Sequence, residues 1–180
     1  MNFKATIIDN ESLKRCLVRI SHQILERNNG SDNLCLIGIK RRGTPIAQII
    51  KNNIENIEGV SIPVGELDIK LYRDDLSEIE KDPKIFDNDS NIPFDVTGKT
   101  IILVDDVIYT GRTARAAIDC LLSKGRPAFI QLAVVVDRGH RELPIRPDFV
   151  GKNVPTSQEE LICVRVPPID DSFEVQLFQK

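Results

Sequence analysis

The chain has 180 residues, a length that suits one domain with one sizeable hydrophobic core. Hydrophobic residues make up 41% and charged residues 28% of the sequence, which is the balance of an ordinary soluble protein. The formal net charge of -3 excludes a basic field over the whole surface, so any nucleic-acid binding needs a local basic patch.

The first residues lack the basic and then apolar pattern of a secretory signal, and no apolar run is long enough to span a bilayer. The four cysteines are scattered and none forms a CxxC pair, which favours reduced, packed thiols. Both observations predict a cytoplasmic protein. The cysteines are Cys16, Cys35, Cys120 and Cys163.

The first part of the chain predicts two amphipathic helices around a buried strand. Apolar side chains recur at helical spacing over residues 11–27, and Asn10 or Ser12 is the expected N-cap. The apolar run at 34–39 predicts a buried strand. After a basic turn, residues 44–57 again show helical spacing, with a proline near the start that suits the first turn of a helix.

Residues 60–72 alternate apolar and polar side chains, which indicates a strand or one arm of a hairpin. Residues 73–98 then lose all periodicity and contain eight acidic and three basic residues. A polar stretch of this length inside a compact domain is typical of a functional flap or of a disordered segment, and a plain surface excursion is the simpler alternative. We expect one domain over residues 1–180, with a flap at about 73–98.

The second half of the chain alternates strands with one helix. Its expected elements are a strand at 100–104, a helix at 113–124, a strand at 128–136 and extended pieces at 148–150, 161–166 and 173–178. Because strand, helix and strand in this order favour parallel pairing with right-handed crossovers, the pattern predicts an α/β fold. We expect a central, mostly parallel sheet flanked by helices.

The most informative stretch is residues 101–117, where a buried strand ends in Asp105 and Asp106 and a glycine-containing loop leads into a helix. Ligands of open parallel sheets bind where strands end and helices begin. The first N–H groups of a helix lack internal partners and the helix dipole adds positive charge, so this loop suits a phosphate. The candidate binding loop comprises Val107, Ile108, Tyr109, Thr110, Gly111, Arg112 and Thr113.

The two carboxylates suit a different part of the same ligand. A carboxylate accepts hydrogen bonds from vicinal hydroxyl groups, so Asp105 and Asp106 match the 2′- and 3′-hydroxyls of a ribose. Together with the phosphate loop they predict a ribose 5-phosphate site. Two alternatives remain open at this point. The Asp and Thr side chains could only cap the following helix, or Asp105 or Asp106 could hold a metal in an acidic phosphotransfer pocket.

The string VDDVIYTGRTARAA resembles the motif that binds 5-phosphoribosyl-1-pyrophosphate (PRPP) in type I phosphoribosyltransferases. Further segments, among them LIGIKRRG, GELDIKLYRDDL and VDRGHRELPIRPDFVGKN, resemble a bifunctional branch of that family, pyrimidine-operon attenuators that are also uracil phosphoribosyltransferases. The resemblance covers about residues 18–157. It implies the type I phosphoribosyltransferase fold, with a small hood and a mobile flap, and the conversion of uracil and PRPP to UMP and pyrophosphate.

The resemblance also implies where pyrophosphate binds. Lys40, Arg41 and Arg42 match the pyrophosphate-binding loop of the family. Family members often have threonine at the position of Arg41, so the match supports a backbone role of Lys40 and Arg41 more than a side-chain role of Arg41. Arg73 matches the base of the mobile hood loop and is expected to meet pyrophosphate as a catalytic residue.

The remaining roles concern the ribose, the metal and the base. By resemblance, Asp105 and Asp106 are the catalytic residues that orient the ribose. Mg²⁺ is expected as the cofactor, held largely by PRPP and not by protein side chains alone. The base pocket is expected near Val136, Asp137 and Arg138, with uracil as the base by resemblance only.

A second activity is implied for the basic strip at residues 124–152, which carries six basic and three acidic residues. Members of this branch that control transcription bind a hairpin in pyrimidine-operon messenger RNA, and UMP tunes that binding. A solvated basic face or a dimer surface is the open alternative, and the resemblance suggests a homodimer or a larger oligomer. The implied RNA contacts are His22, His140, Arg141, Arg146 and Lys152.

Two other functions remain open from the sequence. The chain could be an RNA-binding attenuator with little or no catalytic role, because nothing in the sequence measures the two activities against each other. It could also be a phosphoribosyltransferase for another base, because the site residues do not separate uracil from other oxo-bases.

Overall fold

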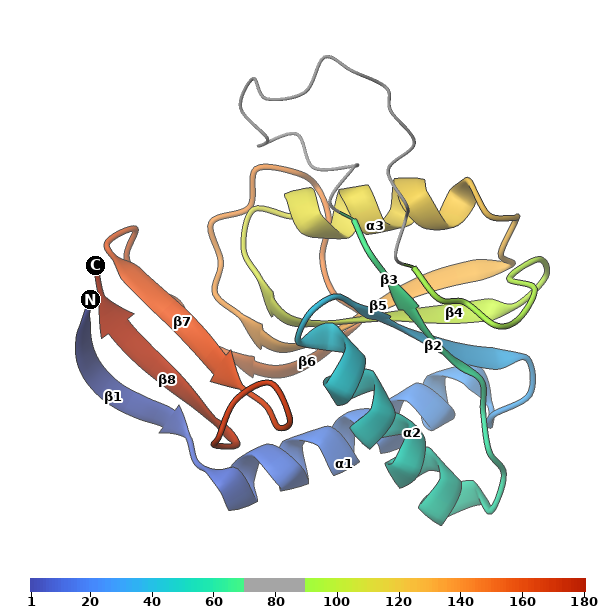
Figure 1. The fold of residues 1–180 in the computed structure, drawn as a ribbon, viewed down its shortest axis with the longest axis horizontal. Helices are drawn as coiled ribbons and strands as arrows, with labels where there is room; N and C mark the ends of the chain where they lie inside the picture. Colours follow the sequence, from blue (N-terminus) through green and yellow to red (C-terminus); the bar gives the residue numbers. More distant parts are fainter. Residues whose placement is uncertain (70–89) are drawn as a thin grey trace.

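The computed structural model describes residues 1–69 and 90–180. Its centre is a five-stranded sheet in the order β3-β2-β4-β5-β6, and every neighbouring pair in it is parallel (Figure 1). This sheet confirms the predicted α/β class. Its strands are β2 (Leu34–Ile39), β3 (Val64–Leu67), β4 (Thr100–Ile108), β5 (Phe129–Asp137) and β6 (Phe149–Asn153).

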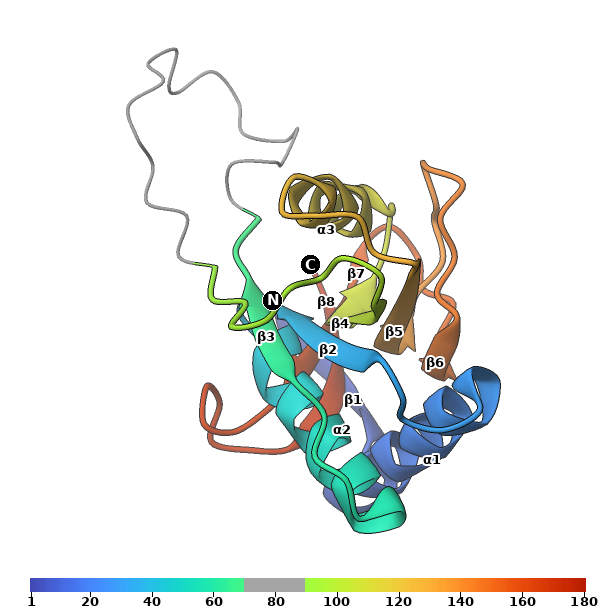
Figure 2. The same cartoon turned by 90° about the vertical axis from the view of Figure 1, so that its right-hand side faces the viewer.

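Three helices cover the two faces of the central sheet. Helices α1 (Asn10–Asn28) and α2 (Gly43–Glu58) lie on one face, and α3 (Arg112–Leu122) lies on the other (Figure 2). Each face buries its own hydrophobic core, because the strands of a parallel sheet are apolar on both sides. The fully buried run of β2 is the clearest example.

A second, antiparallel sheet of three strands lies beside the first, in the order β1-β8-β7 (Figure 1). It joins the two ends of the chain through β1 (Asn2–Ile8), β7 (Glu160–Arg165) and β8 (Glu174–Gln179). The sequence analysis did not predict β1. Most of its residues are exposed, and its partner β8 lies at the other end of the chain, so no local hydrophobic pattern marks it.

One local prediction was wrong in detail. The N-cap of α1 is neither Asn10 nor Ser12 but Asp9, whose carboxylate accepts a hydrogen bond from the Ser12 N–H at 2.8 Å. The stretch predicted as a strand or one arm of a hairpin contains β3, which confirms the strand. Because β3 pairs in parallel with β2, which comes before α2 in the chain, these two strands do not form a hairpin.

The flap was predicted to extend to residue 98, and its C-terminal part is instead packed on the core. Glu66 of β3 and Asn91 exchange two main-chain hydrogen bonds, of 2.8 and 2.9 Å. Val96 is buried at 2% exposure, and it packs in the core under α3. Residues 70–89, which include Arg73 and most of the predicted flap, lie outside the described residues. The extent of one domain over the whole chain stays a prediction.

Candidate functional site

Strand β4 carries both candidate catalytic carboxylates. The sequence predicted that the strand ends at Asp105 and Asp106, but β4 continues to Ile108 because its pairing with β5 continues that far. Its other neighbour stops earlier: the last pair between β2 and β4 joins Gly38 to Val104. The carboxylates therefore lie where β2 has turned away into α2, and this departure opens the edge of β4 to a ligand.

The carboxyl groups of Asp105 and Asp106 lie close together at this point of the strand. A hydrogen bond between the two side chains is one of the effects that limit the rise in the pKa of Asp106. Asp105 lines the cavity at the start of α3. The expectation that both carboxylates reach one sugar stays a prediction.

Asp106 lies in a desolvated environment. Burial raises the pKa of its carboxyl group above the ordinary value of 3.8, and the Val107 N–H and the Arg42 guanidinium offset only part of that rise. The Val107 N–H donates a hydrogen bond of 2.7 Å to the Asp106 carboxylate. In the same way, the Asp106 N–H donates a 2.9 Å bond to the carboxylate of Asp105. These bonds fix the orientation of both acids on the strand.

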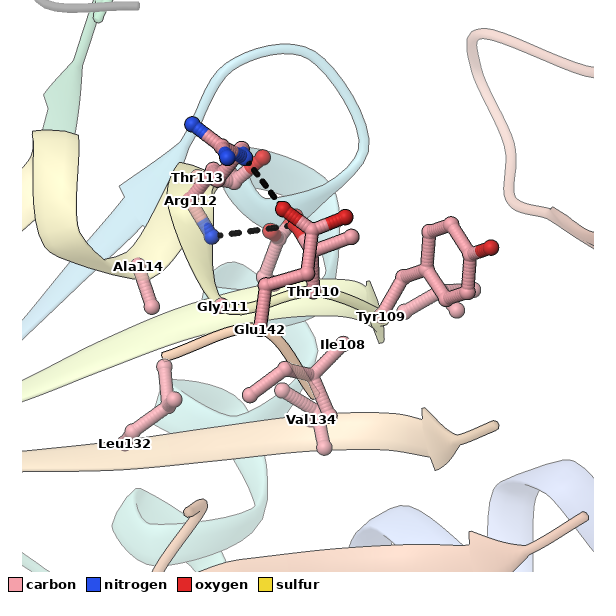
Figure 3. A pocket seen from close by; sticks show the side chains of 12 residues that line it. Ile108, Tyr109, Thr110, Gly111, Arg112, Thr113, Ala114, Leu132, Val134 and Glu142 are labelled. Carbon is pink, nitrogen blue, oxygen red and sulfur yellow. Dashed lines mark hydrogen bonds and ion pairs between the residues drawn. The ribbon is translucent and has the colours of Figure 1, made fainter. Parts of the chain in front are cut away.

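The predicted phosphate loop follows directly and borders a cavity of about 290 Å³ (Figure 3). Gly111 is the N-cap of α3 and has a φ of 93°, a left-handed conformation that favours glycine. The hydroxyl of Thr110 accepts a hydrogen bond from the Arg112 N–H at 3.3 Å. Asp105, the loop at 107–113 and the first turn of α3 thus border one cavity, with the positive end of the helix beside it.

The predicted pyrophosphate loop lies against the same part of β4. A Cβ on Gly43 would collide with the carbonyl oxygen of Val104 and come within 3.3 Å of the Asp105 α-carbon. Only glycine permits this approach, which brings the start of α2 beside the carboxylate pair. The peptide bond between Lys40 and Arg41 is cis.

The three basic residues of this loop have different environments. The Lys40 N–H donates to the Leu67 carbonyl at 3.0 Å, which extends the pairing of β2 with β3. The expected backbone role of Lys40 stays a prediction. The Lys40 ammonium lies 3.4 Å from the Glu66 carboxylate. Arg41 is exposed and borders a separate, mostly apolar cavity of about 420 Å³. Of the two positions, Arg41 is the better candidate for the expected backbone contact.

Arg42 connects the pyrophosphate loop to the antiparallel sheet. Its guanidinium donates two hydrogen bonds of 2.9 Å to the carboxylate of Asp170, in the turn between β7 and β8. These bonds lower the pKa of the Asp170 carboxyl and raise that of Arg42. The side chain of Arg42 is held by Asp170, and its predicted contact with substrate stays a prediction. Sequence analysis missed Asp170 because nothing local distinguishes it from other surface acids.

The predicted base pocket lies at the end of β5. Val136 is fully buried in the core, so its side chain does not reach a ligand and only its main chain can. Arg138 is 4% exposed and donates hydrogen bonds to the Thr156 hydroxyl at 3.0 Å and to the carbonyls of Ser157 and Glu160 at 3.2 and 2.9 Å. These bonds hold the chain that leads into β7 against the end of β5.

The Arg138 guanidinium also lies 4.1 Å from the centre of the Tyr109 ring, a cation–π contact with the phosphate loop. Asp137, the third predicted base contact, accepts hydrogen bonds from the Arg141 side chain and from the Gly139 N–H, the latter at 2.9 Å. The described contacts of Asp137 and Arg138 are therefore within the chain.

The connection between β5 and β6, which we call the 138–148 loop, is bonded to the phosphate loop. The Glu142 and Leu143 N–H groups both donate to the Thr110 carbonyl, at 2.9 and 3.1 Å. The Arg141 side chain donates to the Tyr109 carbonyl at 2.7 Å. Sequence analysis missed this role of Glu142, because the contact joins residues from two different strand ends.

The five predicted RNA contacts lie in two regions. His22 is exposed on α1, and Lys152 on β6 donates to the Ile7 carbonyl at 3.2 Å, so both are near the α1 side of the sheet. Arg141 and Arg146 border a small cavity with Asp137 and Gly139 beside the phosphate loop. The fifth residue, His140, is exposed, and its Nε2 lies 2.5 Å from the Thr156 carbonyl oxygen. RNA binding by these residues stays a prediction.

The carboxylates of β4 meet part of the coordination that Mg²⁺ requires. Asp105 and Asp106 offer the oxygen ligands that this ion prefers. Within residues 1–69 and 90–180, no group of three or more His, Cys, Asp or Glu side chains could hold a metal ion. The residues therefore fit Mg²⁺ only if oxygens of a phosphorylated substrate complete its coordination. In the same described parts of the chain, no helix is long and apolar enough to cross a membrane.

Comparisons with known proteins agree with this geometry. Residues 5–167 match the family model of the phosphoribosyl transferase domain. The chain is 55% identical over 180 residues to the bifunctional protein PyrR of Thermus aquaticus, covering 100% of this chain and 98% of the relative. It is 52% identical over 179 residues to the protein of that name from Clostridium perfringens, covering 99% of both chains.

Solved structures of hypoxanthine phosphoribosyltransferases share the fold. The enzyme of Staphylococcus aureus aligns over 99% of this chain and 94% of its own, with a TM-score of 0.74 and 14% identity. That of Trypanosoma cruzi aligns over 98% and 97%, with a TM-score of 0.75 and 13% identity. At such low identity the likeness shows the fold, and the base is a separate question. The predicted type I phosphoribosyltransferase fold is confirmed, and the chain belongs to the phosphoribosyl transferase family, together with the relatives named bifunctional protein PyrR.

Proposed function

We propose that the protein is a uracil phosphoribosyltransferase that converts uracil and PRPP to UMP and pyrophosphate. One observation carries the proposal: a carboxylate of β4 and the phosphate loop at 107–113 border the same cavity at the start of α3. Binding of a ribose 5-phosphate needs both features: an acceptor for the hydrogen bonds of the ribose hydroxyls and a binding site for the phosphate anion. The choice of uracil rests on the sequence resemblance, not on the geometry.

The phosphoribosyl group is bound at its 5′-phosphate and at its ribose hydroxyls. The N–H groups at the start of α3 and the Thr110 hydroxyl bind the 5′-phosphate, with the helix dipole in support. The adjacent carboxylates of Asp105 and Asp106 accept hydrogen bonds from the ribose hydroxyls. As the bond to pyrophosphate breaks, positive charge develops on the ribose ring, and the adjacent carboxylates stabilise that charge electrostatically.

Pyrophosphate leaves towards the start of α2. The main chain around Arg41 lies on that side because Gly43 allows the loop to approach β4. The β4 carboxylates, together with substrate oxygens, would hold Mg²⁺, which would supply positive charge beside the leaving group. Arg73 is assigned to pyrophosphate by resemblance and lies outside the described residues.

Uracil attacks from the face opposite pyrophosphate. Its N1 forms the bond to the anomeric carbon while the bond from that carbon to the pyrophosphate oxygen breaks, and the N1 proton is released. Main-chain groups at the end of β5, near Asp137, are the candidates to bind the uracil carbonyls. The Arg138 guanidinium acts through position, because its described hydrogen bonds hold Thr156, Ser157 and Glu160.

The test is an assay with PRPP, Mg²⁺ and labelled uracil, in parallel with hypoxanthine as the competing base. The expected result is UMP formation from uracil, with a loss of about 100-fold or more in Asp105→Asn and Asp106→Asn. Asp32→Asn, an exposed position before β2, is the control. Conversion of hypoxanthine alone would show that the enzyme uses a base other than uracil. If neither base is converted, the proposed enzymatic activity is wrong.

We also propose a second function, UMP-dependent binding to a hairpin in pyrimidine-operon messenger RNA. The supporting observation is that the 138–148 loop, which holds three of the predicted RNA contacts, is bonded to the phosphate loop. A gel shift with the organism's own pyrimidine-operon leader should show tighter binding with UMP, weakened by salt. Binding that ignores UMP and sequence would contradict it. A homodimer or larger assembly and a cytoplasmic location are expectations from the same resemblance.

A further inference from the structure

Glu142 holds a position that the proposed chemistry does not explain. It is the one residue from the 138–148 loop among those that line the cavity beside the phosphate loop. Every other lining residue belongs to the segment from β4 into α3 or to β5. The cavity that suits a phosphate dianion therefore has a carboxylate at its rim, in addition to Asp105 at the ribose end.

The carboxylate of Glu142 is held over the phosphate loop, not pointed away from it. Its oxygen accepts a hydrogen bond of 2.7 Å from Nε of Arg112, drawn as a dashed line in Figure 3. The Glu142 N–H donates to the Thr110 carbonyl at 2.9 Å, which fixes the backbone under this side chain. Both side chains of the ion pair are about half exposed, at 47% for Arg112 and 51% for Glu142. The pair can therefore separate at little cost.

A carboxylate and a phosphate favour the same partners. The planar guanidinium of Arg112 can pair with either anion. A carboxylate and a phosphate bound at the same place also repel each other. Resting on the proposed function, we infer that Glu142 is an affinity-determining residue for the reaction: its carboxylate competes with the 5′-phosphate of PRPP and UMP for the side chain of Arg112. Glu142 thereby lowers the affinity for both phosphorylated ligands and speeds the release of UMP.

The experiment measures the binding of UMP and of ribose 5-phosphate to the full chain by calorimetry. Glu142→Gln keeps the shape of the side chain and its acceptor oxygen but removes the charge. The expected result is about threefold to tenfold tighter binding of both ligands, because the competing ion pair is half exposed and partly screened. Glu58→Gln, at the exposed C-terminal end of α2, is the matched control and leaves both affinities unchanged.

A double-mutant cycle with Arg112→Gln separates competition for Arg112 from simple repulsion. If Glu142 acts by holding Arg112, the gain from Glu142→Gln disappears in the Arg112→Gln background. A gain of the same size in that background would overturn the inference, because it would arise from charge repulsion alone. Glu142→Asp, which keeps the charge but shortens the reach, is expected to give an intermediate affinity, and melting temperatures verify that each variant is folded.

The proposed function and the competition by Glu142 are contradicted by different results. If the unsubstituted chain binds neither UMP nor ribose 5-phosphate, the proposed function is wrong. If the unsubstituted chain binds them and Glu142→Gln binds them equally well, the proposed function stands and the competition by Glu142 is wrong.

Discussion

The α-carbon of Gly43, at the start of α2, lies directly against the carbonyl group of Val104 in β4, with no room for a side chain between them. This contact sets the distance between the predicted pyrophosphate loop and the carboxylate pair that follows Val104. One missing methyl group thus brings together two parts of the site that lie far apart in the sequence.

Gly43→Ala is expected to move the pyrophosphate loop away from β4. The added methyl meets backbone atoms, which cannot rotate away, so the expected loss is about 1–3 kcal/mol in the free energy of unfolding. PRPP binding should weaken as well, which calorimetry measures. Gly59→Ala is the matched control at the other end of α2: its φ of 70° is strained for alanine, but nothing lies within 4 Å. Its PRPP affinity should be unchanged, and equal affinity losses in both variants would contradict the explanation.

Asp170→Asn tests the contact between the pyrophosphate loop and the antiparallel sheet. The expected loss is about 1–2 kcal/mol in the free energy of unfolding at neutral pH, at the low end for a charged bidentate pair because the Arg42 side chain is 32% exposed. Asp171→Asn, the exposed neighbour, is the control.

The same pair gives a pH dependence with a definite sign. The hydrogen bonds from Arg42 lower the pKa of the Asp170 carboxyl below 3.8. The pair therefore stabilises the fold above that value and loses its contribution as the pH falls through the lowered pKa. The stability difference between the unsubstituted chain and Asp170→Asn should stay constant above about pH 5 and shrink towards pH 3, measured by denaturant unfolding. A difference that does not change with pH would argue against the ion pair.

Asp106→Asn should show the opposite trend. Burial raises the pKa of the Asp106 carboxyl, so the aspartate stabilises the fold best when protonated and loses stability as the pH rises through the raised pKa. The asparagine variant does not titrate, and its stability relative to the unsubstituted chain should therefore increase from acidic to neutral pH. Unfolding curves across that range measure it. If the stability of both proteins depends on pH in the same way, burial does not destabilise the charged form of the Asp106 carboxyl group.

Arg138→Lys tests the connection at the end of β5. Lysine keeps the charge but cannot make the same three hydrogen bonds or stack on Tyr109, and the expected loss is about 2–3 kcal/mol in the free energy of unfolding. Arg126→Lys, at an exposed position before β5, should cost almost nothing. If Arg138→Lys is as stable as the control but has a raised KM for uracil, Arg138 contacts the base directly.

Arg141 is one of the predicted RNA contacts, but Arg141→Ala should affect the nucleotide site as well as RNA binding. Because Arg141 donates to the Tyr109 carbonyl at 2.7 Å, its loss should also loosen the phosphate loop and weaken UMP binding about threefold to tenfold. His22→Ala, exposed on α1, is the cleaner variant and should leave UMP binding unchanged. Calorimetry with UMP compares the two, and unchanged binding in both would separate Arg141 from the nucleotide site.

Local sequence patterns predicted the three helices, the strands of the central sheet and the loop that follows β4. Those features are local: an apolar run predicts a buried strand, helical spacing predicts a helix, and a strand, two acids and a glycine loop before a helix predict an anion seat. The parallel pairing in the central sheet was predicted from the order of strands and helices, and all four of its neighbouring pairs are parallel. Strand ends were less well predicted, because β4 extends beyond its apolar run through pairing with β5.

Which side chains meet depends on how distant segments of the chain pack together. Several side-chain pairs join segments that are distant in the sequence, and no local sequence pattern predicts them. These pairs are Arg42 with Asp170, Arg138 with Tyr109 and Arg112 with Glu142. Strand β1 likewise depends on a distant segment, because its main-chain hydrogen bonds are made with β8. Local periodicity specifies what each segment becomes, whereas the partners of charged side chains depend on how the segments pack.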